Sequence, residues 1–80
     1  MKKLYFIQYL GDDLLLENKI ISLGRYHQVF GGWIVESIIE AKAIHEYLSS
    51  HKPLMDIIVL GLDKKNFWGR STQELWNLFK

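Results

Sequence analysis

The stretch Leu4–Leu10, with the sequence LYFIQYL, constrains the fold of this chain more than any other feature. Gln8 is its only polar residue, and the stretch ends at Gly11. A strand with one face in water alternates apolar and polar side chains, whereas a strand that is apolar at successive positions needs cover on both faces. The sequence therefore predicts a central strand of a sheet here.

A second, almost wholly apolar strand is predicted at Asp56–Leu62, with the sequence DIIVLGL. Between the two strands, the first helical pattern covers about residues 13 to 23, where leucine and isoleucine recur at helical spacing. Asp12 or Asp13 is expected to cap its first turn, and Gly24 to end it. A short first helix therefore follows the first strand.

A hairpin is predicted around Gly31-Gly32, which separates the strand-like runs Tyr26–Phe30 and Trp33–Glu36. Two-residue hairpin turns need positive φ angles, and glycine adopts them without strain. Both glycines are therefore expected in the turn of an antiparallel hairpin.

Ser37 and Glu40 have the spacing of a capping box, in which each side chain bonds the backbone N–H of the other residue. A second helix is therefore expected to start directly after the hairpin, and Pro53 prevents its continuation. Ser71 and Glu74 repeat the spacing and predict a short C-terminal helix.

The predicted order is β-α-β-β-α-β with a terminal helix, within a single domain of residues 1–80. This order is typical of an α+β, ferredoxin-like fold. Right-handed crossovers place both connecting helices on one face of the sheet. Because the first strand is apolar on both faces, we expect a homodimer that packs sheet against sheet through Tyr5, Ile7 and Tyr9.

The chain has a formal net charge of +1, so it has no global field to hold a polyanion, and nucleic-acid binding needs a local basic patch. Cysteines are absent, so no disulfide or thiolate metal site is expected. No apolar run approaches the roughly 18 residues that a membrane helix needs. We therefore expect a soluble, cytoplasmic protein without a membrane partner.

Five segments carry a family resemblance: KLYFIQYL, GGWIVES, AKAIHEYL, MDIIVLGL and FWGRSTQELWNLF. They span nearly the whole chain, and the placements of Trp33 and of Trp68-Gly69 are the most particular. In this order they resemble the CRISPR-associated endoribonuclease-like family, the small ferredoxin-fold subunit of the spacer integrase, and especially its stand-alone SinR-like relatives.

The resemblance implies a homodimer that cuts RNA or DNA with a metal in some members and only scaffolds nucleic acid in others. For toxin and antitoxin relatives, the resemblance implies a protein that degrades or regulates messenger RNA. The family's catalytic Asp follows a Tyr at the end of the first strand. Tyr9 matches that Tyr, but the next residue is Leu10, which cannot bind Mg²⁺. We therefore expect no family nuclease activity and no cofactor.

Two candidate sites remain in the sequence. Asp12 and Asp13 would be the carboxylates of a Mg²⁺ site if the chain were a nuclease, although a helix cap is the favoured role. Basic residues beside an aromatic pair are the other candidate, because cations grip phosphates while rings stack on bases. These residues are Lys64, Lys65, Arg70 and Trp68. The alternative is that Trp68 packs in the core or the dimer interface while the charges are solvated.

Three functions remain open. The first is a catalytically inactive, nucleic-acid-associated homodimer of a defence or toxin-antitoxin system. The second is a metal-dependent endoribonuclease that uses Asp12, Asp13 or another carboxylate. The third is a small protein-binding module, such as a phage or plasmid inhibitor.

Overall fold

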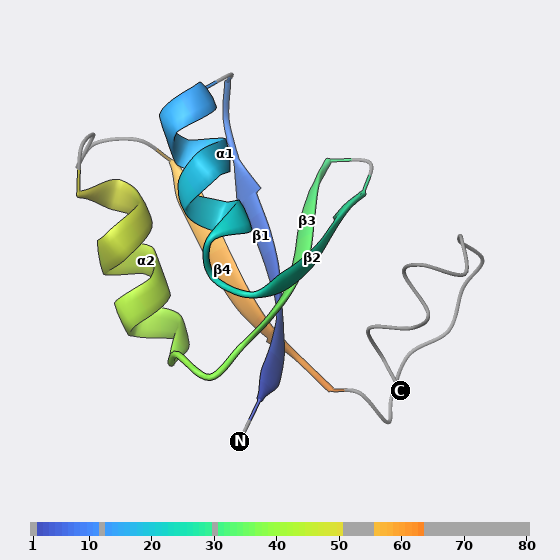
Figure 1. The fold of residues 1–80 in the computed structure, drawn as a ribbon. Coiled ribbons are helices and arrows are strands. Elements are labelled where there is room, and N and C mark those ends of the chain that lie inside the picture. Colours follow the sequence, from blue (N-terminus) through green and yellow to red (C-terminus); the bar gives the residue numbers. More distant parts are fainter. Residues whose placement is uncertain (1, 12, 30, 51–55, 64–80) are drawn as a thin grey trace.

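The computed structural model describes residues 2–11, 13–29, 31–50 and 56–63. These residues form a four-stranded antiparallel sheet and two helices, so the fold is α+β (Figure 1). The elements are β1 (Lys3–Tyr9), α1 (Leu14–Ile21), β2 (Arg25–Val29), β3 (Gly32–Ser37), α2 (Ala41–Ser49) and β4 (Ile57–Leu62). The predicted C-terminal helix lies outside the described residues.

The strand order across the sheet is β2-β3-β1-β4, and every neighbouring pair is antiparallel. β1 is thus a central strand, as its apolar sequence predicted, and β2 and β4 are the edges. In the register, Leu4 lies opposite Glu36 of β3 and Leu62 of β4. This register fixes which side chains share a face, because successive residues of a strand point to opposite sides.

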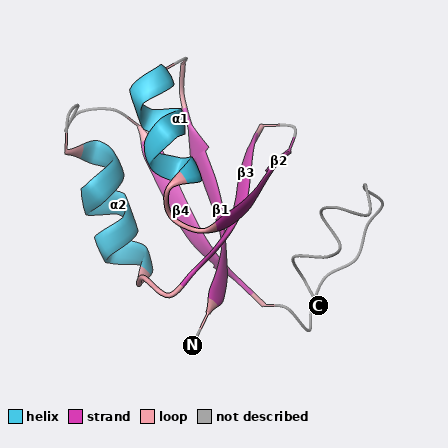
Figure 2. Ribbon diagram, viewed as in Figure 1, coloured by secondary structure: helices cyan, strands magenta, loops and turns pink. Residues whose placement is uncertain are grey.

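Both helices pack on one face of the sheet, as Figure 2 shows. Each helix contributes two buried apolar side chains, four residues apart, to the core. These are Leu16 and Ile20 from α1, and Ile44 and Leu48 from α2. All four side chains are fully buried. They cover the sheet residues of the main core, which are Tyr5, Ile7, Trp33, Val35 and Ile57.

The start of α1 confirms the predicted role of Asp13. Its side chain accepts a hydrogen bond of 3.1 Å from the backbone N–H of Leu16, and its backbone is extended, as an N-cap requires. Asp12, the other candidate cap, lies outside the described residues. The helix ends at Ile21, two residues before the predicted end, and the following Leu23 still packs against the core.

The hairpin forms where the sequence placed it, but its two glycines have different roles. Gly31 has a φ of +87°, whereas Gly32 has no positive φ and is the first residue of β3. A Cβ on Gly32 would lie 2.5 Å from the carbonyl oxygen of Ile7 and 2.8 Å from the ring of Phe6. The prediction of a positive φ at Gly32 is therefore wrong, and close packing against β1 is what requires a glycine there.

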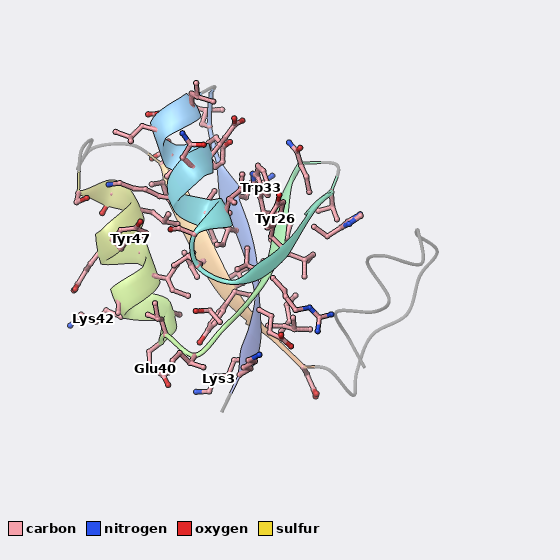
Figure 3. All side chains as sticks on the ribbon, viewed as in Figure 1. Lys3, Tyr26, Trp33, Glu40, Lys42 and Tyr47 are labelled. Atoms are coloured by element: carbon pink, nitrogen blue, oxygen red, sulfur yellow. The ribbon has the colours of Figure 1, made fainter. Side chains whose placement is uncertain are left out.

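The predicted capping box at Ser37 and Glu40 is also wrong. Ser37 is the last residue of β3, paired with Lys3, and its Oγ accepts a hydrogen bond of 3.2 Å from Ile39 N–H. α2 begins at Ala41, and its N-cap Glu40 makes no side-chain cap bond. The Glu40 carboxylate instead pairs with Lys3 Nζ at 2.9 Å (Figure 3). Because Ser37 is paired with β1 as part of the sheet, it does not act as the N-cap of α2.

Candidate interaction surface

The two faces of the sheet have separate apolar clusters. One face lies under α1 and α2 and carries the main core. We call the other the open face, because none of the helices in the described ranges covers it. By strand register and packing its apolar residues are Leu4, Phe6, Val29, Ile34, Ile58, Leu60 and Leu62.

The structure corrects the predicted dimer interface. Tyr5 and Ile7 are 2% and 0% exposed within the core under the helices, and Tyr9 packs against that core. Tyr5 and Ile7 are therefore not available to a second copy of the chain, whereas Tyr9 is half-buried. The prediction chose the wrong face because β1 carries apolar side chains on both faces, so its sequence does not distinguish them. On the open face, β1 presents Leu4 and Phe6.

Exposed apolar surface on the open face is concentrated at the β4 edge. At the centre, Leu4 and Ile34 are buried and pack with the half-buried Phe6, Val29 and Leu62. At the edge, Ile58 and Leu60 are about half exposed, at 53% and 52%. An exposed, uncharged edge strand is a ready template for pairing with another chain.

This apolar surface continues past the end of β1. Leu10 is 75% exposed, and its backbone N–H donates a hydrogen bond of 3.2 Å to the carbonyl of Asp56, just before β4. Leu10 and Ile58 line a cavity of about 330 Å³ together with Gln8, Tyr9 and Asp56. We call Leu10, Ile58 and Leu60 the β4 patch.

A charged group occupies the opposite corner of the open face. The carboxylate of Glu36 is 6% exposed and lies 3.8 Å from Arg25 Nη1 and 4.0 Å from Lys2 Nζ. Arg25 and Glu36 are directly paired in the β2–β3 register, so both side chains project from the open face. The two cations offset the cost of burying this carboxylate.

Position 10, where the resemblance leads us to expect a catalytic Asp, offers no metal ligand. Leu10 has an aliphatic side chain, and Asp13 is used as the cap of α1. Within the part of the chain that the structure describes, no three His, Asp or Glu side chains gather closely enough to hold a metal ion.

The predicted nucleic-acid residues Lys64, Lys65, Trp68 and Arg70, and the candidate ligand Asp12, lie outside the described residues. Neither helix of the described ranges is long and apolar enough to cross a membrane.

Sequence reasoning missed the residues that form the β4 patch. The predicted hairpin contained part of the signal, because its register sets which residues of β2 and β3 share a face, but it does not say which face the helices cover. The sequence gives no signal for the register between β1 and β4, because these two segments are far apart in the chain.

Comparison with protein-family models, with curated proteins and with solved structures finds no match for this chain.

Proposed function

We propose that this chain is a ferredoxin-like homodimer that associates with nucleic acid in a defence or toxin-antitoxin system, without the nuclease activity of the family it resembles. Support for the fold comes from the element order β-α-β-β-α-β and the strand order β2-β3-β1-β4. Each helix connects two strands that are separated in the sheet by one other strand, as in the split βαβ arrangement.

The observation that carries the proposed self-association is the β4 patch. Leu60 and Ile58 expose about half of their surface on an edge strand that has no charged side chain of its own. Contact with a second copy removes this apolar surface from water, which is favourable in proportion to the area buried. A standard interface buries about 800 Å² per partner, so we expect the patch to be part of a larger contact surface.

The proposed loss of nuclease activity depends on Leu10. An aliphatic side chain stands where the family's metal-binding carboxylate is expected, and Mg²⁺ needs oxygen ligands. Asp13, the described carboxylate next in sequence, contributes its oxygen to the backbone of α1. A binding or scaffolding role fits these two residues better than hydrolysis.

Light scattering and sedimentation of the purified chain test the self-association. We expect a dimer at micromolar concentration and a shift toward monomer in Leu60→Lys. The matched control is Leu15→Lys, because Leu15 is also 52% exposed but lies on α1, away from the β4 patch. A monomer at every accessible concentration, or an equal effect of the two variants, would contradict the proposed dimer.

Binding to labelled RNA and DNA tests the nucleic-acid association separately. We expect retention of at least one of the two in a gel-shift titration at low salt. Absence of any binding at 50 mM salt would remove this part of the proposal without affecting the dimer.

The second candidate function is a protein-binding module, such as a phage or plasmid inhibitor. The β4 edge favours it, since an extended segment of a partner can add a strand there through main-chain hydrogen bonds. A monomeric chain that binds neither RNA nor DNA would make this candidate the first choice.

A further inference from the structure

A small pocket lies where the β2–β3 hairpin meets the first turn of α1. Its volume is about 220 Å³, and its walls include Tyr9 and Trp33 from the sheet, Glu17 from α1 and Gln28 from β2. Pockets for drug-sized ligands measure about 300 to 1,000 Å³. This pocket is therefore large enough for one side-chain-sized group and too small for a nucleotide.

The charged group in the wall of this pocket is the carboxylate of Glu17. Glu17 is half-buried, and its Oε1 accepts a hydrogen bond of 3.2 Å from the Tyr9 hydroxyl. The ion pairs found within the described ranges involve Glu36 and Glu40, not Glu17. Lys19 follows two residues later, but its ammonium donates 2.7 Å to Ser50 Oγ on the α2 side. Among the described residues, Glu17 thus has no cationic partner.

The remaining walls also favour a positively charged group. The ring of Tyr9, which is half-buried, carries partial negative charge on its face, and this attracts cations. Trp33 is held in place by the core and by Tyr26, whose ring centroid lies 5.8 Å away on the neighbouring strand (Figure 3). Gln28 adds an amide that can accept a hydrogen bond.

Backbone forms much of the pocket rim. Gly11 and Gly31 line it and have φ angles of +95° and +87°, which residues with a side chain rarely adopt. The sharp turns that these glycines permit bring the main chain to the rim without adding side chains there. A long, narrow group can therefore enter.

We propose that this pocket binds a guanidinium group. Guanidinium is planar, always charged and able to donate two parallel hydrogen bonds to one carboxylate, and it stacks on aromatic faces. Glu17, Gln28 and the ring of Tyr9 supply those contacts. The group comes either from a free small guanidine or from an arginine side chain of a protein partner, because the recognised chemistry is the same. This inference is independent of the proposed dimer.

The test is an NMR titration of the ¹⁵N-labelled full chain, with the assigned indole N–H of Trp33 as reporter. Agmatine represents the free ligand, and N-acetylarginine amide represents the protein side chain. N-acetylcitrulline amide is the uncharged control of nearly the same shape. We expect both guanidinium compounds to bind with a Kd on the order of 1 mM, as suits a single anchored group. The uncharged control should leave the reporter unshifted.

Three variants complete the test. Glu17→Gln should weaken agmatine binding about tenfold or more, because hydrogen bonds to a charged partner are the strongest contacts available. Glu46→Gln removes an equivalent charge from α2 and should change nothing. Gln28→Ala, at an exposed strand position, should weaken binding by a smaller factor with the fold intact.

Tighter binding of agmatine would assign the pocket to a free ligand, and tighter binding of the arginine amide would assign it to a protein partner. Equal binding of the citrulline compound, or unchanged binding in Glu17→Gln, would overturn the proposal. So would shifts that map to residues away from the pocket.

Discussion

Leu4 and Tyr5 are neighbours in β1, yet they are buried in two different hydrophobic clusters. Tyr5 lies under the helices with the main core, and Leu4 packs with Ile34 on the open face. Each is at most 2% exposed. A strand that is buried on both sides gives the sheet two apolar faces, and the described helices cover only one of them.

Replacing Tyr5 with Phe should stabilise the protein. The Tyr5 hydroxyl is buried, and no hydrogen-bond partner is found for it among the described residues. Burying a polar group without a partner costs free energy, so its removal should raise the free energy of unfolding by about 1 kcal/mol.

The matched control is Tyr9→Phe, which loses the hydrogen bond to Glu17 and should lower the free energy of unfolding by about 0.5 to 1 kcal/mol. Urea unfolding of both variants measures the two effects. A loss of stability in Tyr5→Phe similar to that of Tyr9→Phe would mean that the Tyr5 hydroxyl is hydrogen-bonded in solution.

Gly32→Val should destabilise the fold strongly because of steric contact with β1. Even a Cβ at this position would lie 2.5 Å from the carbonyl oxygen of Ile7, so the hairpin must shift away from the central strand. Overpacking of this kind costs about 1 to 3 kcal/mol. Gly61→Ala is the control, since a Cβ there has no atom within 4 Å. Equal melting temperatures for the two variants would show that the hairpin and β1 are further apart than the structure has them.

The order and type of the described elements could be predicted from the sequence, because apolar period, turn glycines and caps are local signals. The residue at which β3 ends could not be predicted from the sequence. Ser37 fits a helix cap as well as a strand, and the choice is made by pairing with Lys3, which is 34 positions away in the chain. The face of the sheet that is open could not be predicted either. Leu4 and Tyr5 are both apolar, so only the packing of Leu16 and Ile44 decides which side is covered.

Asp13→Ala should lower the free energy of unfolding by about 1 kcal/mol, whereas Asp13→Asn should change it little. The carboxylate accepts the N–H of Leu16 at 3.1 Å, and an Asn oxygen can replace it in an N-cap. Glu40→Ala is the control at the other helix, where the N-cap side chain makes no cap bond and its ion pair with Lys3 is exposed. That variant should change the stability little, because exposed ion pairs are screened by water. Thermal unfolding at neutral pH compares the three, and a larger loss at Glu40 would contradict the cap assignment.

The last prediction concerns catalysis and follows from Leu10. If no carboxylate at this position binds a metal, labelled RNA and DNA should remain uncut in the presence of Mg²⁺ or Mn²⁺, as they do with a chelator. The variants Asp12→Asn and Asp13→Asn should then behave like the parent chain in this assay.

Any binding of nucleic acid should instead depend on the basic residues Lys64, Lys65 and Arg70. It should weaken steeply with salt, because binding to phosphates releases counterions. Replacing all three with Gln should abolish binding, and unchanged circular dichroism and melting temperature would show that the loss comes from the charges and not from unfolding. Replacement of Lys42, which lies exposed on α2, is the matched control for loss of a cation. Metal-dependent cleavage that disappears in either Asp variant would instead make the chain a nuclease, with those carboxylates in the role that Leu10 cannot fill.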